Sequence, residues 1–169
     1  MNNIVLIGMP GVGKSTIGVI LAKITGRTFI DTDLLIQEQQ GKLLKDIIAH
    51  RGVEGFLAIE DQVLASIKTN NAVIATGGSA VYGKNAMAHL KEGGTIVYLK
   101  LDIASLSRRL SNIKNRGVVY KEGQTLEDIF AERCQLYEKY ADITIEEGSH
   151  DPETVIEKLL IALAPLNKG

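Results

Sequence analysis

The sequence predicts an α/β fold in which a parallel sheet of five strands is covered by helices on both faces. Short runs of β-branched residues alternate with segments of helical periodicity, as expected for parallel strands joined by helical crossovers. We expect strands near residues 4–8, 28–31, 72–76, 95–99 and 142–146. A glycine-rich turn follows the first strand, and residues 16–23 after that turn have a helical pattern.

The turn after the first strand carries a phosphate-binding motif. Residues 8–16 read Gly-Met-Pro-Gly-Val-Gly-Lys-Ser-Thr and fit the pattern G-x-x-x-x-G-K-[ST]. In this pattern the glycines let backbone N–H groups surround a β-phosphate, the lysine places charge near the β and γ oxygens, and the hydroxyl reaches Mg²⁺. The following helix directs its N-terminus at the phosphates. The residues expected to bind the nucleotide are Gly11, Val12, Gly13, Lys14, Ser15 and Thr16, with Lys14 also catalytic and Ser15 also a metal ligand.

The second strand ends in two carboxylates, Asp31 and Asp33, whereas the third strand, 72–76, ends without one. Their spacing predicts that both side chains lie on one face of an extended chain beside the phosphate loop. Asp31 is then suited to hold Mg²⁺ or its waters, and Asp33 to accept a proton from a substrate hydroxyl or to align it. The alternative for Asp33 is to cap a helix that begins at Leu34.

Two segments outside the regular alternation are candidates for substrate handling. The second and third strands are separated by a long excursion with helical patterns at 43–48 and 56–64. We expect an acceptor-binding region over about residues 33–64, because insertions at the carboxyl ends of strands carry the chemistry of such folds. The basic, glycine-containing stretch at about 112–124 predicts a lid over the phosphates, with a solvated surface loop as the alternative.

Further candidates follow the third strand and the predicted lid. Gly77 and Gly78 let the backbone approach a ligand and offer N–H groups to an anion. Arg116 in the lid is a candidate for the phosphates and Arg109 for the adenine face, although either arginine taken alone also fits a surface position. Arg133, on a helical pattern over 126–133, is suited to bind an acceptor anion.

The composition favours a single folded domain and argues against proteins that bind nucleic acid or membranes. With 169 residues, of which 45% are hydrophobic, the chain is long enough for one domain with its own core. A net charge of −1 gives no electrostatic footprint for nucleic acid. The single cysteine, Cys134, and the absence of a leader or a bilayer-spanning run favour a cytoplasmic protein that does not bind membranes, and we expect a monomer.

Taken together, these residues resemble the shikimate kinase family of small phosphate-loop (P-loop) kinases over nearly the whole chain. The resemblance implies a five-stranded parallel sheet like that of nucleoside monophosphate kinases, a mobile lid, and transfer of the γ-phosphoryl group of ATP to a hydroxyl of a small acceptor. It also implies site roles. Asp33 grips the acceptor hydroxyls, Arg133 binds the acceptor carboxylate, Gly77 and Gly78 line the acceptor pocket, and Arg109 packs on adenine.

The chain departs from the family pattern on the acceptor side. Where the family has G-E-x-x-F-R-x-x-E, residues 52–60 read Gly-Val-Glu-Gly-Phe-Leu-Ala-Ile-Glu. Leu57 therefore replaces an arginine that holds the shikimate carboxylate, and Glu60 loses that partner. Ser79 replaces the third glycine of G-G-G, and the lid reads Arg116-Gly117 in place of Arg-Pro.

These departures leave three functions open. The first is phosphorylation of shikimate to shikimate 3-phosphate, with Arg51 as a candidate to replace the missing charge. The second is a kinase for a different small hydroxylated metabolite. The third is a nucleotide-sensing module that has kept its ATP site and lost its acceptor.

Overall fold

The computed structural model describes residues 2–111, 121–148 and 151–167. Its strands form one sheet in the order β2-β3-β1-β4-β5, and every neighbouring pair is parallel. The predicted strands are confirmed, each with bounds within one residue of the expected ones. The strands are β1 (Asn3–Ile7), β2 (Thr28–Asp31), β3 (Ala72–Ala75), β4 (Gly94–Lys100) and β5 (Ile143–Glu146).

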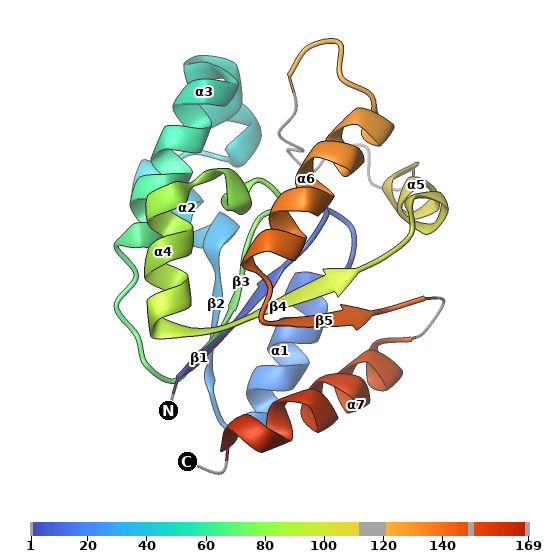
Figure 1. The fold of residues 1–169 in the computed structure, drawn as a ribbon. Coiled ribbons are helices and arrows are strands. Elements are labelled where there is room, and N and C mark those ends of the chain that lie inside the picture. Colours follow the sequence, from blue (N-terminus) through green and yellow to red (C-terminus); the bar gives the residue numbers. More distant parts are fainter. Residues whose placement is uncertain (1, 112–120, 149–150, 168–169) are drawn as a thin grey trace.

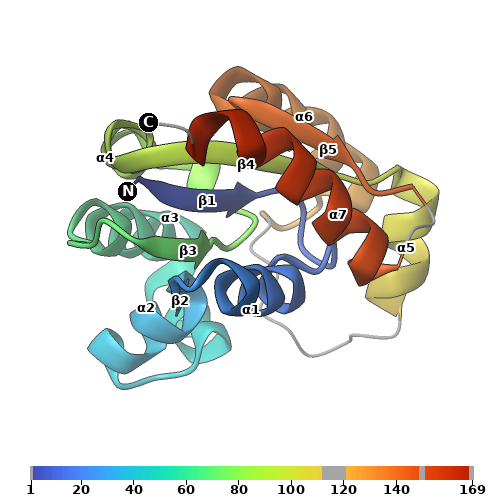
Figure 2. The same ribbon diagram turned by 90° about the horizontal axis from the view of Figure 1, so that it is seen from below.

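Helices cover both faces of this sheet, as the sequence predicts. Figures 1 and 2 show α1 and α7 side by side on one face and α3, α4 and α6 over the other. The α-helices are α1 (Lys14–Thr25), α2 (Thr32–Gln40), α3 (Leu44–Ala65), α4 (Lys84–Gly93), α5 (Ile103–Ser111), α6 (Leu126–Tyr140) and α7 (Pro152–Leu163). The described residues also form short 3-10 helices, η1 (Ala80–Tyr82) before α4 and η2 (Ala164–Asn167) after α7.

The central strand β1 and its neighbour β3 lie in the middle of the core. Every residue of β1 and β3 is buried, and all of them except Asn3 are apolar, because a parallel strand covered on both faces has no solvent side. Tyr98 of β4 packs against Tyr137 of α6 with ring centroids 5.1 Å apart. This aromatic pair fixes α6 against the sheet and so determines where the residues of α6 reach the site.

The long excursion between β2 and β3 contains α2 and a broken α3. The helical segments expected at 43–48 and 56–64 both belong to α3, the first of them starting one residue early at the N-cap Leu43. The helix is interrupted at Gly52 with φ 69° and ψ 176°. A side chain disfavours this φ, so glycine permits the break. Both parts of α3 contribute to the cavity described below, the first through Leu44 and Lys45 and the second through Phe56.

Within the described ranges, none of the helices combines the length and the apolar character needed to cross a membrane.

Candidate active site

A cavity of about 550 Å³ lies where the loops after β1, β2 and β3 meet. Parallel strands all end at the same edge of the sheet, so residues distant in sequence come together there. The cavity is lined by the phosphate loop, the end of β2, the corner between α2 and α3, the residues after β3, and Arg133 of α6. The predicted site residues that line it are Gly11, Gly13, Lys14, Ser15, Thr16, Asp31, Asp33, Gly77, Gly78 and Arg133.

The phosphate loop wraps around the side chain of Lys14. Its ammonium group donates to the carbonyl oxygens of Gly8 at 2.6 Å and Met9 at 2.8 Å. Gly11 and Gly13 adopt φ values of 86° and 90°, the left-handed region that the tight curl requires. Burial lowers the pKa of Lys14 to about 8, and the nearby Asp33 carboxylate opposes that shift.

The two carboxylates after β2 take different structural positions. Asp31 accepts a hydrogen bond from the Ser15 hydroxyl at 2.7 Å through Oδ2. Its Oδ1 accepts from the backbone N–H groups of Asp33 at 3.0 Å and Leu34 at 3.2 Å, and Asp31 is therefore the N-cap of α2. The alternative that Asp33 caps this helix is wrong, because the helix begins directly after the strand, at Thr32.

The expectation that Asp31 and Asp33 share one face of an extended chain is also wrong. Asp33 lies in the first turn of α2, where the two-residue repeat of a strand does not apply. Both side chains nevertheless line the same cavity. The short helix α2 thus brings Asp33 to the cavity by a different local geometry from the predicted one.

The glycines after β3 allow three segments to approach one another closely. A Cβ atom on Gly77 would lie 2.6 Å from Oδ1 of Asp33, and one on Gly78 would lie 2.6 Å from Cδ of Pro10. The Gly78 carbonyl accepts a hydrogen bond from the Tyr137 hydroxyl at 2.6 Å. Larger residues here would push Asp33 and the phosphate loop out of position, so packing alone already requires these glycines.

Arg133 is 2% exposed and lines the cavity from the side of α6. Its guanidinium lies over the ring of Tyr82, with 5.4 Å from Cζ to the ring centroid. The Tyr82 hydroxyl in turn donates to Oε1 of Glu132 at 2.5 Å. The predicted anion-binding arginine therefore has a fixed, buried position at the cavity wall.

Glu60 has a partner that the sequence does not reveal. The Ser79 hydroxyl donates to Oε1 of Glu60 at 2.6 Å, and both side chains are buried. Burial raises the pKa of Glu60 to about 8; the Ser79 hydrogen bond opposes this shift and Asp33 adds to it. The departures at Leu57 and Ser79 meet at Glu60, because the Ser79 hydroxyl bonds one oxygen of the carboxyl that the missing arginine would have paired. The other oxygen, Oε2, is buried and has no hydrogen-bond partner among the described residues.

A second cavity of about 510 Å³ is also lined by Arg133. Leu57 lines this second cavity and is absent from the lining of the first. Arg51 is exposed and lines neither cavity. Lys45, by contrast, lines the first cavity, although the sequence gives no sign of it beyond a place in a helical segment.

Arg109 contacts the backbone of the phosphate loop. It donates to the carbonyl oxygens of Gly11 and Val12, each at 3.3 Å, and to Oε2 of Glu147 at 3.2 Å. Glu147 is buried just after β5, and burial raises its pKa while Arg109 opposes that shift. The sequence reasoning missed Glu147. The predicted contact of Arg109 with adenine stays a prediction.

Most of the predicted lid, including Arg116 and Gly117, lies outside the described residues. The described end of that stretch, 121–124, is a turn in which the Lys121 N–H donates to Oε1 of Gln124 at 3.0 Å.

The chain was compared with known proteins by sequence and by structure. A family model described as shikimate kinase matches residues 10–164. The shikimate kinase of Nitrosospira multiformis is 36% identical over 160 residues, which cover 93% of this chain and 82% of that protein.

Solved structures agree with this similarity. A shikimate kinase from Acinetobacter baumannii, solved in complex with shikimate, superimposes with a TM-score of 0.90 at 32% identity, covering 100% of this chain and 96% of that one. The shikimate kinase from Aquifex aeolicus gives a TM-score of 0.84 at 29% identity, with 99% of each chain covered.

Proposed function

The chain belongs to the shikimate kinase family, and from that premise we propose that it transfers the γ-phosphoryl group of ATP to shikimate, giving shikimate 3-phosphate. Family membership makes it an ATP-dependent small-molecule kinase. The observation that carries the proposal is that the phosphate loop and the predicted acceptor residues Asp33, Gly77, Gly78 and Arg133 line one cavity. The comparisons do not favour a different acceptor or a nucleotide sensor.

On the donor side, residues 11–16 bind the ATP phosphates through backbone N–H groups. Lys14 supplies positive charge at the β and γ oxygens, where negative charge shifts as the bond to the leaving oxygen lengthens. Arg109 packs on the adenine ring, and Arg116 adds charge at the phosphates from the lid. The contacts of Lys14 and Arg109 with loop carbonyls support a place for these two cations beside the nucleotide, because both already lie against the loop.

The donor set also suits a magnesium ion held by Ser15 and Asp31. Their side-chain oxygens lie 2.7 Å apart at the cavity. Mg²⁺ usually keeps several waters and is held by one or two carboxylates together with substrate phosphates, so a larger protein cluster is not needed. The described residues contain no group of three or more His, Cys, Asp or Glu side chains that could hold a metal. When bound, Mg²⁺ would neutralise charge on the β- and γ-phosphates.

On the acceptor side, Asp33 accepts the proton of the attacking hydroxyl or aligns that hydroxyl with the γ-phosphorus. Arg133 pairs with the carboxylate of shikimate, and the backbone at Gly77 and Gly78 lines the pocket. Burial of Arg133 supports this role, since a desolvated guanidinium binds a carboxylate more strongly than an exposed one.

We propose further that residues 1–169 act as a single kinase domain and as a cytoplasmic monomer that binds neither nucleic acid nor membranes. Within it, residues of about 33–64 form the acceptor region, and those of about 112–124 form the lid. The net charge of −1 supports a small-molecule substrate over a nucleic acid.

The test is a coupled assay of ADP release with shikimate, quinate, gluconate and nucleosides, followed by NMR of the product. We expect turnover with shikimate and phosphorylation at its 3-hydroxyl. Turnover with another compound alone would replace shikimate as the acceptor. Tight nucleotide binding without turnover of any compound would favour a nucleotide-sensing module.

A further inference from the structure

Few of the described basic side chains line the first cavity, the one that contains the phosphate loop, and one of them is bonded to that loop. Among the described residues, three basic side chains line this cavity: Lys14, Lys45 and Arg133. Lys14 is buried and bonded to the carbonyls of Gly8 and Met9, so its charge serves the donor phosphates. The other two are Arg133 and Lys45, and an anionic acceptor in this cavity would lie near both.

These two cations differ in character. Arg133 is buried at the cavity wall, whereas Lys45 is exposed and therefore sits at the rim. In the described part of the chain, the Lys45 ammonium forms no hydrogen bond or ion pair. A cationic group with no protein partner that faces an acceptor cavity is available to a ligand carboxylate.

The corner that carries Lys45 is held in place by its surroundings. The Leu44 N–H donates to Oε1 of Gln37 at 3.0 Å, which joins the start of α3 to α2. Ile47, two residues after Lys45, is buried in the core. Only the flexible side chain of Lys45 must therefore be ordered when a ligand binds.

We propose that Lys45 is a specificity-determining residue that recognises the acceptor carboxylate together with Arg133. This inference rests on the proposed function for the identity of the acceptor. Neither alternative position supplies the charge, because Arg51 lines neither cavity and residue 57 is a leucine that faces the second cavity. A lysine at the rim contributes a compact, hydrated charge and not a bidentate pair, so its effect weakens with added salt.

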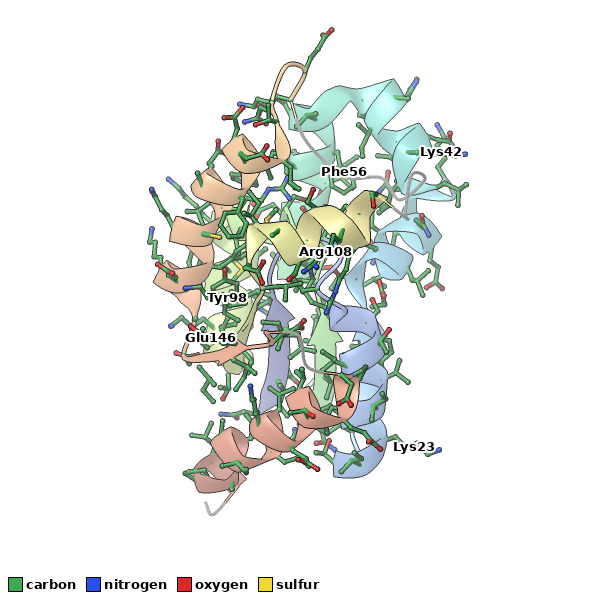
Figure 3. All side chains as sticks on the ribbon, turned by 90° about the vertical axis from the view of Figure 1, so that its right-hand side faces the viewer. Lys23, Lys42, Phe56, Tyr98, Arg108 and Glu146 are labelled. Carbon is green, nitrogen blue, oxygen red and sulfur yellow. The ribbon has the colours of Figure 1, made fainter. Side chains whose placement is uncertain are left out.

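The experiment measures binding directly, so that it does not depend on turnover. Isothermal titration calorimetry with a nonhydrolysable ATP analogue and Mg²⁺ would compare shikimate with its neutral methyl ester. The variants are Lys45→Met and Lys45→Glu. The matched control is Lys42→Met, because Lys42 lies three residues away at the outer edge of the molecule and lines neither cavity (Figure 3).

We expect Lys45→Met to weaken shikimate binding about fivefold, the scale of an exposed ion pair, and Lys45→Glu to weaken it more. Binding of the methyl ester should change less than twofold, and Lys42→Met should change neither ligand. A shikimate dissociation constant within twofold of wild type in Lys45→Met, or equal losses for acid and ester, would overturn the inference. Wild-type protein that binds shikimate without phosphorylating it would refute the proposed function, while the same titrations still decide the role of Lys45.

Discussion

Lys14 and Asp33 are residues of opposite charge that line one cavity. Their surroundings suit Lys14 to bind a phosphate group and Asp33 to bind the acceptor hydroxyl. Lys14 is buried with two carbonyl partners in its own loop, and its pKa is lowered to about 8 by burial. A phosphate group brought to the loop would favour the charged form again, because an opposite charge raises the pKa of an ammonium. Asp33 lines the same cavity, beside Gly77.

Replacing Lys14 with Met should abolish useful phosphoryl transfer and leave the fold intact. Methionine fills the buried volume but carries no charge, so kcat/KM should fall at least about 100-fold. Steady-state kinetics and the far-ultraviolet circular dichroism spectrum measure the two effects. Turnover within twofold of wild type would show that the lysine charge is not used.

Replacing Asp33 with Asn should lower kcat at least about 100-fold, the lower end of a general-base contribution, with little change in ATP affinity. The amide keeps the size of the side chain beside Gly77 but cannot accept a proton. The measurements are kcat at saturating substrates and the dissociation constant of an ATP analogue. A collapse of ATP affinity with turnover preserved at saturating ATP would instead identify Asp33 as a metal-site residue.

For single residues, the sequence predicts a functional role where the residue belongs to a local motif. It does not predict a role that depends on contacts between residues far apart in the chain. The phosphate loop can be identified from the sequence, because binding phosphate requires its glycines, lysine and hydroxyl at a fixed spacing along the chain. The Ser79–Glu60 hydrogen bond joins residues 19 positions apart, and its existence depends on how α3 packs on the end of β3. Lys45 likewise can be recognised as a candidate ligand-binding residue only when the lining of the cavity is known.

At the scale of elements, the junction between β2 and α2 combines two tasks in Asp31. One carboxylate oxygen caps α2, and the other accepts from Ser15 at the predicted metal site. Capping requires an acceptor atom but no charge, whereas binding a cation requires the charge. The two tasks are therefore separable by mutation.

Replacing Asp31 with Asn should keep the cap and weaken the metal site. We expect a free energy of unfolding within about 0.5 kcal/mol of wild type, because asparagine caps helices as well as aspartate. The Mg²⁺ concentration for half-maximal activity should rise about tenfold or more. Urea unfolding and magnesium titrations of activity provide the data.

The paired variant Asp31→Ala should lose both functions, with about 1 kcal/mol less stability than Asp31→Asn. Equal stability losses in the two variants would mean that the charge, and not the cap, holds the start of α2.

The positions of the strands follow from their apolar runs, so their bounds could be predicted within one residue. The start of α2 could not, because Asp31 and Asp33 are both good capping residues and the choice depends on where β2 leaves the sheet. The break in α3 at Gly52 was equally hidden, since glycine is also tolerated inside a helix at some cost.

At the scale of the whole molecule, the sheet order explains why the site lies where it does. β1 is central, with β3 on one side and β4 on the other, so the phosphate loop after β1 meets the segments after β2 and β3 (Figure 1). Arg133 reaches the same place from α6, which the Tyr98–Tyr137 contact fixes on the sheet. Periodicity alone predicts a parallel sheet but not this order, which depends on long-range pairing.

The buried carboxyl of Glu60 makes the stability of the whole molecule depend on pH. Its pKa is raised from 4.5 to about 8 in the folded protein, chiefly by burial. A carboxyl whose pKa is raised by folding favours the folded state most at low pH, and that contribution is lost as pH rises from about 4.5 to about 8. Lys14 also titrates near the upper end of this range, so a difference between variants is needed to isolate Glu60.

Replacing Glu60 with Gln should remove this dependence, because the amide stays neutral and can still accept a hydrogen bond from Ser79. Between pH 5 and pH 8 the wild-type protein should lose free energy of unfolding relative to Glu60→Gln, by at most about 1.4 kcal/mol per pH unit. Urea unfolding at several pH values measures the difference. Lys14 is present in both proteins, so its titration largely cancels.

The control is the exposed Glu38→Gln, which should follow the wild type at every pH. Parallel curves for wild type and Glu60→Gln would show that Glu60 is ionised in the folded protein, and that water or a cation reaches the carboxyl beside Ser79.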